Sequence, residues 1–190
     1  MRNWVLRAGL LLLLPPLAVR AQELPKAEVY AGYSFVRDFK VNHHGWDTSI
    51  AATINKNLSF VADVSGHYAR VEGNTFGFPF NDDVNLHSIM VGPRVSETVG
   101  KWRPFVHALV GITRVSESTK LIISNTTVSD SFNKVGFSVA VGGGMDYWLT
   151  NRLALRVPQA EYYMFRIGDN KNETPRLGAG LVFRFGSKPE

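Results

Sequence analysis

The chain ends with "RLGAGLVFRFGSKPE" (residues 176–190), and this stretch decides the class of fold. One alternate set of its residues is wholly apolar and consists of Leu177, Ala179, Leu181, Phe183 and Phe185. The other set is small, aliphatic or cationic and consists of Arg176, Gly178, Gly180, Val182 and Arg184. Because successive side chains point to opposite faces of a strand, this period of two predicts a β-strand with one apolar face.

The same alternation recurs along the chain and predicts eight strands. They span Ala27–Arg37, Gly45–Asn55, Leu58–Arg70, Val84–Val95, Trp102–Val115, Asn133–Trp148, Leu153–Arg166 and Pro175–Phe185. Globular strands usually have five or six residues, whereas a tilted membrane strand needs about 9–11. The fourth segment is ambiguous because both faces hold apolar residues, and Arg94 indicates that the face with Leu86, Ser88 and Met90 points inward.

The connectors alternate between short and long. "NKN", "SETVGK" and "LTN" are short, whereas "VEGNTFGFPFNDD" (71–83) and "SESTKLIISNTTVSDSF" (116–132) are long. This alternation predicts that all long loops lie at one end of the fold, as in transmembrane barrels. Soluble eight-stranded barrels of the lipocalin type remain an alternative, but their apolar face points inward.

Aromatic residues gather toward both ends of the predicted strands. Those near the short turns are Trp102, Trp148, Phe183 and Phe185, and those near the long loops are Tyr33, Phe35, Trp46, Tyr68 and Phe165. Two such belts match the preference of Trp and Tyr for membrane interfaces, although a sandwich core would also hold aromatic residues. Only a closed sheet satisfies every backbone group in lipid. We therefore expect an all-β fold, an eight-stranded antiparallel up-and-down transmembrane β-barrel.

The N-terminal segment has the layout of a secretory signal peptide. Two arginines precede an apolar run, prolines break the run, and small residues precede a cleavage site after Ala21. We expect residues 1–21 to be removed and residues 22–190 to form the barrel. The leader holds three of the 21 basic residues and no acid, so the mature chain has 18 basic and 16 acidic residues, a net charge of +2 instead of +5. The basic residues are scattered, which argues against nucleic-acid binding, and the chain has no cysteine for disulfide or thiol chemistry.

Charged side chains are expected inside the barrel. The inward set is predicted to be Glu28, Asp63, His67, His107, Arg114, Arg156, Glu161, Arg176 and Arg184. An isolated buried charge costs several kcal/mol, so these groups are expected to pair and fill the lumen. The alternative is a gated polar path for ions.

The long loops carry the candidate contact residues. Apolar residues in these otherwise polar segments are Phe76, Phe78, Phe80, Leu121, Ile122 and Ile123. Exposed apolar side chains can contact a partner, and Leu121–Ile123 can extend a hairpin whose edge pairs with a partner strand. Alternatively, both loops fold over the barrel mouth.

No metal, cofactor or catalytic group is expected. His43, His44 and Asp47 share the first long loop, but no third ligand follows at a diagnostic spacing. His87 and Ser88 are neighbours in a strand and therefore face opposite sides, whereas a base must reach its nucleophile.

The leader, "AVGGGMDYWLTNRLALR" (140–156) and "GLVFRF" (180–185) resemble the outer-membrane β-barrel family of eight-stranded OmpA-like, OmpX-like and opacity-type proteins. The resemblance implies a location in the bacterial outer membrane and contact with its lipid. It also implies that Gly180, Phe183 and Phe185 match the C-terminal assembly signal that the barrel-assembly machinery recognises.

The expected function is therefore that of an integral outer-membrane barrel with a structural role and a surface-interaction role through its long extracellular loops, whose partner the sequence does not name. Three alternatives remain open at this point. They are a small ion-conducting barrel, a lipid A-modifying enzyme and a soluble periplasmic barrel that binds an apolar ligand.

Overall fold

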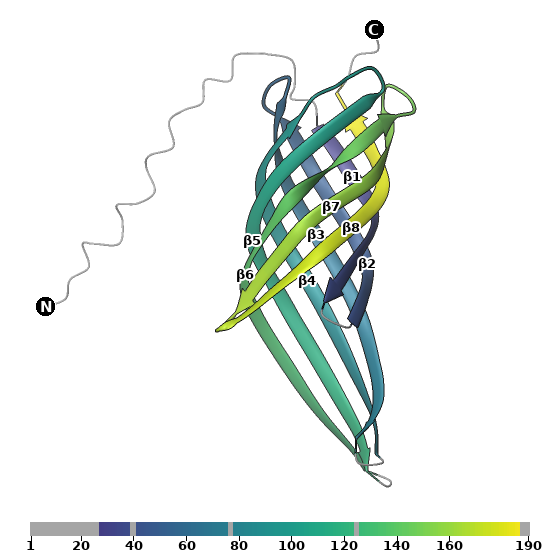
Figure 1. Cartoon of the computed structure of the whole chain (residues 1–190), viewed down its shortest axis with the longest axis vertical. Helices are drawn as coiled ribbons and strands as arrows, with labels where there is room; N and C mark the ends of the chain where they lie inside the picture. The colour runs from purple at the N-terminus through teal and green to yellow at the C-terminus, as the bar shows by residue number, and fades with distance from the viewer. Residues whose placement is uncertain (1–26, 39–40, 76–77, 124–125, 187–190) are drawn as a thin grey trace, which may run out of the picture.

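The computed structural model describes residues 27–38, 41–75, 78–123 and 126–186, and the signal peptide expected at residues 1–21 lies outside them. Eight antiparallel strands follow one another around a closed barrel, and β8 pairs with β1 (Figure 1). The strands are β1 (Ala27–Asp38), β2 (Val41–Thr53), β3 (Leu58–Thr75), β4 (Phe78–Ser96), β5 (Trp102–Ile123), β6 (Thr126–Trp148), β7 (Leu153–Ile167) and β8 (Asn170–Phe185). The predicted eight-stranded antiparallel up-and-down barrel is confirmed. None of the described residues lies in a helix that is long and apolar enough to cross a membrane.

Side chains alternate between the lumen and the outer surface. In the middle of β5, Leu109 is fully buried while its neighbour Val110 is 49% exposed. The inward face predicted for the fourth segment is confirmed, because Leu86, Ser88 and Met90 are all buried. The outer face is apolar and the inner face mixes polar with apolar residues, which is the reverse of a soluble ligand-binding barrel.

Four strands extend far beyond the others at the end of the barrel opposite the short turns (Figure 1). β3, β4, β5 and β6 have 18, 19, 22 and 23 residues, whereas β1 and β2 have 12 and 13. Pairing of β2 with β3 ends at His44↔Tyr68, and pairing of β6 with β7 ends at Phe137↔Arg166. Beyond these pairs β3–β6 form a four-stranded sheet, here called the projecting sheet, made of residues 69–75, 78–84, 115–123 and 126–136.

The two long connectors expected at residues 71–83 and 116–132 were therefore predicted wrongly as loops. Within the described residues these segments are strand, and their backbones pair across two long hairpins. The prediction failed because both segments contain many residues that are typical of loops, with Gly73, Gly77 and Pro79 in the first and several Ser and Thr residues in the second. The expected hairpin extension at Leu121–Ile123 is confirmed, because these residues pair with residues 126–128 of β6.

The inner face also holds aromatic residues that were expected on the outer surface. Trp148 and Phe165 are only 9% and 3% exposed. Trp148 lies two residues after the inward-facing Asp146 in the same strand, so its side chain also points inward. In β7 the register shifts between Arg156 and Gln159, so both of these residues point inward and every later residue changes face. This bulge turns Phe165 into the lumen. The inward positions expected for both Arg156 and Glu161 already required such a change of face, but the outer position expected for Phe165 did not take it into account.

Candidate functional site: the lumen and the barrel mouth

The end of the barrel that carries the short turns, here called the short-turn end, has one carboxylate surrounded by three arginines. Glu28 in β1 accepts hydrogen bonds from Arg94 at 2.7 Å, from Arg103, and from Arg184 at 2.9 Å. Arg103 also donates to Ser96 at 3.0 Å. These groups come from β1, β4, β5 and β8, so the cluster ties both sides of the β8–β1 closure to the opposite wall.

A second ion pair lies next along the lumen. Arg156 in β7 donates to both carboxylate oxygens of Asp146 in β6, at 2.7 and 3.1 Å. Its guanidinium lies 4.5 Å from the ring centre of Tyr30 and 4.3 Å from that of Phe105. Arg156 also donates to Gln159 at 3.3 Å, which connects this pair to the acidic groups farther along.

The third group lies closer to the mouth and is centred on Arg176. Here several acidic side chains surround one arginine, whereas at the short-turn end several arginines surround one acid. This arginine in β8 donates to Glu161, to Asp63 at 3.4 Å and to Ser65 at 3.2 Å. Glu161 also pairs with His107 at 2.7 Å. The side-chain amide of Gln159 donates to Glu161 at 2.8 Å and to Asp47 at 3.1 Å.

Lumen charge is balanced in total but unevenly distributed. Among the described residues, five carboxylates point into the lumen, namely Glu28, Asp47, Asp63, Asp146 and Glu161, and so do five guanidinium groups, namely Arg94, Arg103, Arg156, Arg176 and Arg184. Three guanidinium groups surround one carboxylate at the short-turn end, whereas one guanidinium lies among three carboxylates toward the mouth. Arg94, Arg156 and Arg176 are also among the largest fully buried side chains of the described residues. Large paired side chains therefore fill these levels of the lumen.

The predicted lumen residues fall on the inner face with one exception. Glu28, Asp63, His67, His107, Arg156, Arg176 and Arg184 all point inward, and His67 is hydrogen-bonded to Ser34 at 2.8 Å. The prediction for Arg114 was wrong, because this residue is exposed and donates to Asn133 at 2.8 Å. Arg114 lies two residues after Ile112 in β5, and both side chains therefore point outward. Sequence reasoning missed Arg103 and Asp146, although Arg103 has the phase of the inward residue His107 and Asp146 has the phase of Gly142 and Gly144, which lie opposite the apolar Val139 and Val141.

The histidine pair expected in a loop lies instead in β2. His43 and Asp47 are buried on the inner face, whereas His44 is exposed and hydrogen-bonded to Tyr33. The chain is already in regular strand pairing here, with His43 opposite Val36. Within the part of the chain that the structure describes, no group of three His, Cys, Asp or Glu side chains could hold a metal ion.

His87 and Ser88 point to opposite sides of β4. The His87 ring contacts Tyr68 on the outer surface, with the Tyr68 hydroxyl 3.2 Å from its Nε2. The buried Ser88 hydroxyl lies 2.6 Å from that of Ser65. The barrel wall thus separates the imidazole from the hydroxyl, and these two groups do not form a nucleophile and its base.

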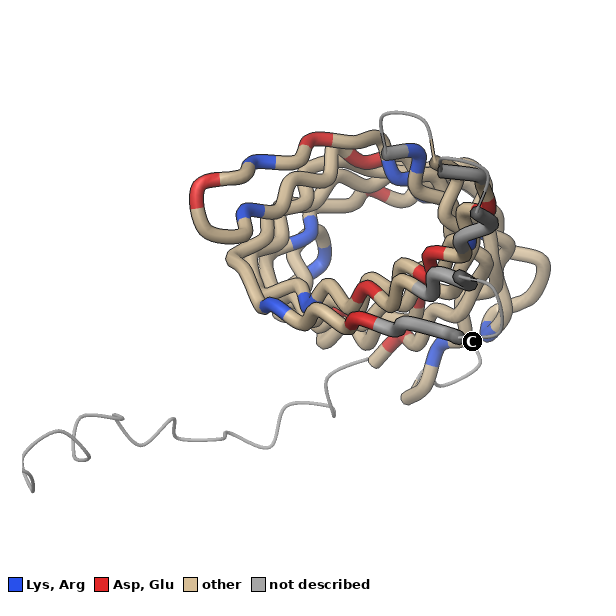
Figure 2. Tube along the Cα trace, turned by 90° about the horizontal axis from the view of Figure 1, so that it is seen from below, with Lys and Arg blue, Asp and Glu red and all other residues tan. Residues whose placement is uncertain are grey.

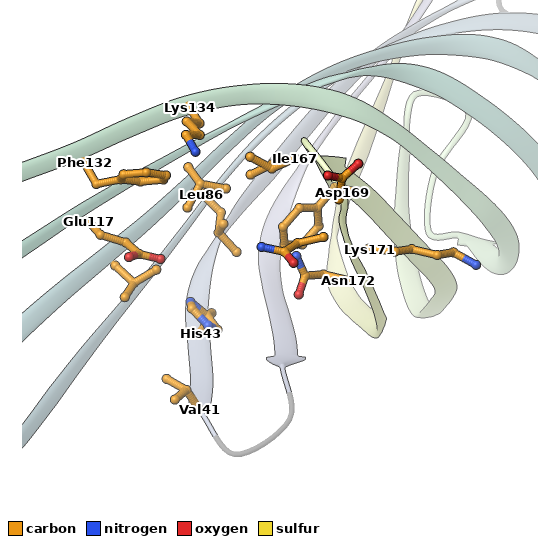
Figure 3. Close-up of a pocket in the computed structure, with 14 residues that line it drawn as sticks. Val41, His43, Leu86, Glu117, Phe132, Lys134, Ile167, Asp169, Lys171 and Asn172 are labelled. Carbon is orange, nitrogen blue, oxygen red and sulfur yellow. The ribbon is translucent and has the colours of Figure 1, made fainter.

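A cavity of about 780 Å³ opens at the mouth of the barrel, beneath the projecting sheet. Leu86, Val115, Phe165 and Ile167 are among its apolar lining, and Glu117, Phe132 and Lys134 face Asp169 and Asn172 across it (Figure 3). The Lys134 ammonium lies 4.5 Å from the ring centre of Phe132. Lys171, at the rim, pairs with Glu173, and this hydrogen bond raises the pKa of the Lys171 ammonium above its usual range. An apolar floor with charged groups at its edge separates the filled lumen from the exterior.

The loop-contact residues predicted from sequence lie in strands as far as they are described. Phe78 and Phe80 belong to β4, and Leu121–Ile123 belong to β5, where Leu121 is the pairing partner of Phe80. Phe76 lies outside the described residues. These backbone positions sit at the far end of the projecting sheet.

The predicted assembly signal lies at the closure of the barrel. Gly180, Phe183 and Phe185 in β8 pair with Gly32, Val29 and Ala27 in β1. Phe183 and Phe185 are exposed on the outer surface. A Cβ atom on Gly180 would lie 2.3 Å from the carbonyl oxygen of Ala31, so this position needs glycine for the two strands to approach.

No protein-family model matches the chain, and comparison with curated proteins found no match. Solved structures do match in fold. The attachment invasion locus protein Ail of Yersinia pestis, solved with the heparin analogue sucrose octasulfate, is 19% identical with a TM-score of 0.58, over 84% of this chain and 99% of Ail. Neisserial surface protein A is 16% identical with a TM-score of 0.58, over 84% and 96%. A major outer membrane protein from Thermus thermophilus is 14% identical with a TM-score of 0.64, over 84% and 99%. At these identities the similarity establishes a shared fold.

Proposed function

We propose that this barrel, which shares its fold with outer-membrane proteins, spans a bacterial outer membrane as an exported protein with its signal peptide removed. One observation carries the proposal, namely the apolar residues exposed around the outer face. They include Ile50, Phe60, Val64, Ile89, Val91, Val106, Val110, Phe137, Leu155 and Leu181. A soluble monomer rarely exposes an apolar patch of more than a few hundred Å², whereas lipid solvates such a band.

The short-turn end faces the periplasm in this proposal, and the projecting sheet extends outside the cell. Outer-membrane barrels have short periplasmic turns and longer extracellular segments. Aromatic residues support the membrane-spanning position, because exposed Trp102 and Phe185 lie near the short turns and exposed Tyr33, Trp46 and Tyr68 lie toward the mouth, one group at each interface. Gly180, Phe183 and Phe185 would serve as the signal that the barrel-assembly machinery recognises.

The proposed role is structural and surface-interactive, without catalysis. The buried ion pairs fill the lumen and favour a structural plug over an ion path. The projecting sheet has two free edges, residues 69–75 of β3 and 126–136 of β6, which lack a neighbouring strand among the described residues. Free edges can pair with an extended segment of another protein. The apolar residues proposed as contacts are Phe76, Phe78, Phe80, Leu121, Ile122 and Ile123. The described ones among them lie in β4 and β5, between the two free edges, and would add side-chain contacts to the edge pairing.

Cysteine labelling in intact cells tests this topology, and the natural chain has no cysteine to interfere. Ser131→Cys places a thiol on the projecting sheet, and Lys56→Cys places one in the short turn between β2 and β3. A membrane-impermeant maleimide should label the Ser131→Cys variant in intact cells, and the Lys56→Cys variant only after the outer membrane is permeabilised.

A gel with and without boiling provides the control for folding. Both variants should be recovered in the membrane fraction and should shift in mobility on heating, as a closed barrel does. Recovery in the soluble periplasmic fraction without a shift would refute the membrane proposal. Equal labelling of both sites in intact cells would refute the orientation.

A further inference from the structure

A girdle of arginines surrounds the barrel just beyond its apolar band. Arg37, Arg70, Arg114 and Arg166 are all exposed, and they lie in β1, β3, β5 and β7. Each follows by two positions an outer-face apolar or aromatic residue, in the order Phe35, Tyr68, Ile112 and Met164. Two residues along a strand keep the same face and advance by about 6–7 Å. All four strands run toward the mouth. On every second strand, therefore, one outward guanidinium lies just beyond the apolar band, on the side of the mouth.

Seen from the mouth, lysine and arginine positions are distributed around the barrel wall rather than gathered on one side (Figure 2). The girdle arginines differ in their partners. Arg70 forms an ion pair with Asp83 at 2.7 Å. Arg114 donates to the neutral amide of Asn133 at 2.8 Å, and Arg166 to the carbonyl of Gly168 at 3.3 Å. Among the side chains that the structure describes, Arg37, Arg114 and Arg166 have no acidic partner, so each keeps its full positive charge at the rim.

We propose that Arg37, Arg114 and Arg166 bind phosphate groups on the headgroups of outer-leaflet lipids. This inference rests on the proposed membrane location. The three guanidinium groups lie one pleat beyond the apolar band, which is the level at which headgroups begin. A planar guanidinium binds phosphate in a bidentate manner, and each basic residue near an anionic lipid surface strengthens binding. Arg70 contributes little, because Asp83 neutralises it.

The test measures binding of bisphosphorylated lipid A to the full-length mature protein refolded in an uncharged detergent. A fluorescently labelled lipid A gives the dissociation constant, with chemically dephosphorylated lipid A and inorganic phosphate as comparison ligands. Arg37→Gln, Arg114→Gln and Arg166→Gln should each weaken binding about fivefold, the factor that corresponds to about 1 kcal/mol per basic residue. The triple variant should bind roughly 100-fold more weakly if the three contributions add.

The Arg70–Asp83 pair provides matched controls. The double variant Arg70→Gln with Asp83→Asn removes an exposed pair without changing the net charge, so lipid A binding should stay within about twofold of the unmodified chain. Asp83→Asn alone frees the Arg70 guanidinium and should tighten binding about fivefold. A heat-modifiable gel shift for every variant confirms that the barrel has folded.

Several outcomes would overturn the inference. These are wild-type affinity in the triple variant, equal binding of dephosphorylated lipid A, and competition by inorganic phosphate at millimolar concentration, which would indicate a site for the free anion. A loss of binding in the paired double variant as large as in the triple variant would also overturn it. Failure of the membrane proposal can be distinguished from failure of this inference. It would appear in the labelling and gel-shift experiments, whose variants keep all four girdle arginines.

Discussion

Replacing Glu28 with glutamine should strongly destabilise the barrel. Its carboxylate is the shared acceptor for Arg94, Arg103 and Arg184, and Arg94 and Arg103 are almost fully buried. Glutamine keeps the shape and one acceptor oxygen but removes the negative charge. Three guanidinium groups would then lie together without an acid between them, and their mutual repulsion would add to the cost of burial.

The expected magnitude follows from the burial of these groups. Removing one partner of a buried ion pair typically costs about 3–5 kcal/mol, because the remaining charge stays uncompensated. Arg184→Gln is the matched control, since its side chain is 22% exposed and Glu28 would keep two arginine partners. This variant loses a stacking contact of 3.7 Å with Trp148 and should cost only about 1 kcal/mol.

Equilibrium unfolding of the protein in lipid vesicles provides the assay. Tryptophan fluorescence follows the transition in urea, and the free energy of unfolding is compared between the unmodified chain, Glu28→Gln and Arg184→Gln. If Glu28→Gln lies within about 1 kcal/mol of the unmodified chain, or if Arg184→Gln costs as much, water solvates the cluster and the argument from buried charge fails.

Three further predictions concern the outer face, the lumen and the closure of the barrel. Val110→Arg, in the middle of the lipid-facing surface, should cost about 2–4 kcal/mol in vesicles, whereas Ser118→Arg on the projecting sheet should stay within about 0.5 kcal/mol; equal effects would contradict the lipid-facing assignment. In planar bilayers the protein should show no steady unit conductance, because paired arginines fill the lumen, and a reproducible conductance step would instead support an ion path. Gly180→Ala should cost about 1–3 kcal/mol, because the added Cβ would meet the Ala31 carbonyl oxygen. Gly178→Ala should cost less, since the nearest atom would lie 3.3 Å from the added Cβ. A smaller effect at Gly180 than at Gly178 in the same urea titration would show that the β1 and β8 backbones can move apart.

Much of the fold was predictable because alternation is a local property. Residues 177–185 reveal an apolar face and a polar face without knowledge of any other strand, and the same pattern in seven other segments predicts the number of strands. Prediction failed where the pattern is absent or shifts phase. The hairpin around residues 116–132 is rich in Ser and Thr, which are typical of loops, and the bulge after Arg156 reverses the faces of Tyr163 and Phe165.

The candidate site was predictable only as a set of inward charges. Phase within each strand indicates that Glu28 and Arg184 point into the lumen, but it names no partner for either. Glu28 and Arg94 are 66 positions apart in sequence, and Glu28 and Arg184 are 156 apart. Which acid compensates which arginine depends on the register between neighbouring strands and on the tilt and stagger of the strands around the closed barrel.

The sequence by itself determined the number of strands, the barrel-forming part of each, its two chemically different faces and the need for a closed sheet, because these follow from side-chain period and from the cost of unpaired backbone groups in lipid. Only the tertiary structure decided that three arginines converge on Glu28 while three carboxylates converge around Arg176. It also decided that Arg70 is neutralised while Arg37, Arg114 and Arg166 are not. The physical reason is that Coulomb interactions depend on distance in space, and closure of the barrel brings together groups that the chain holds far apart.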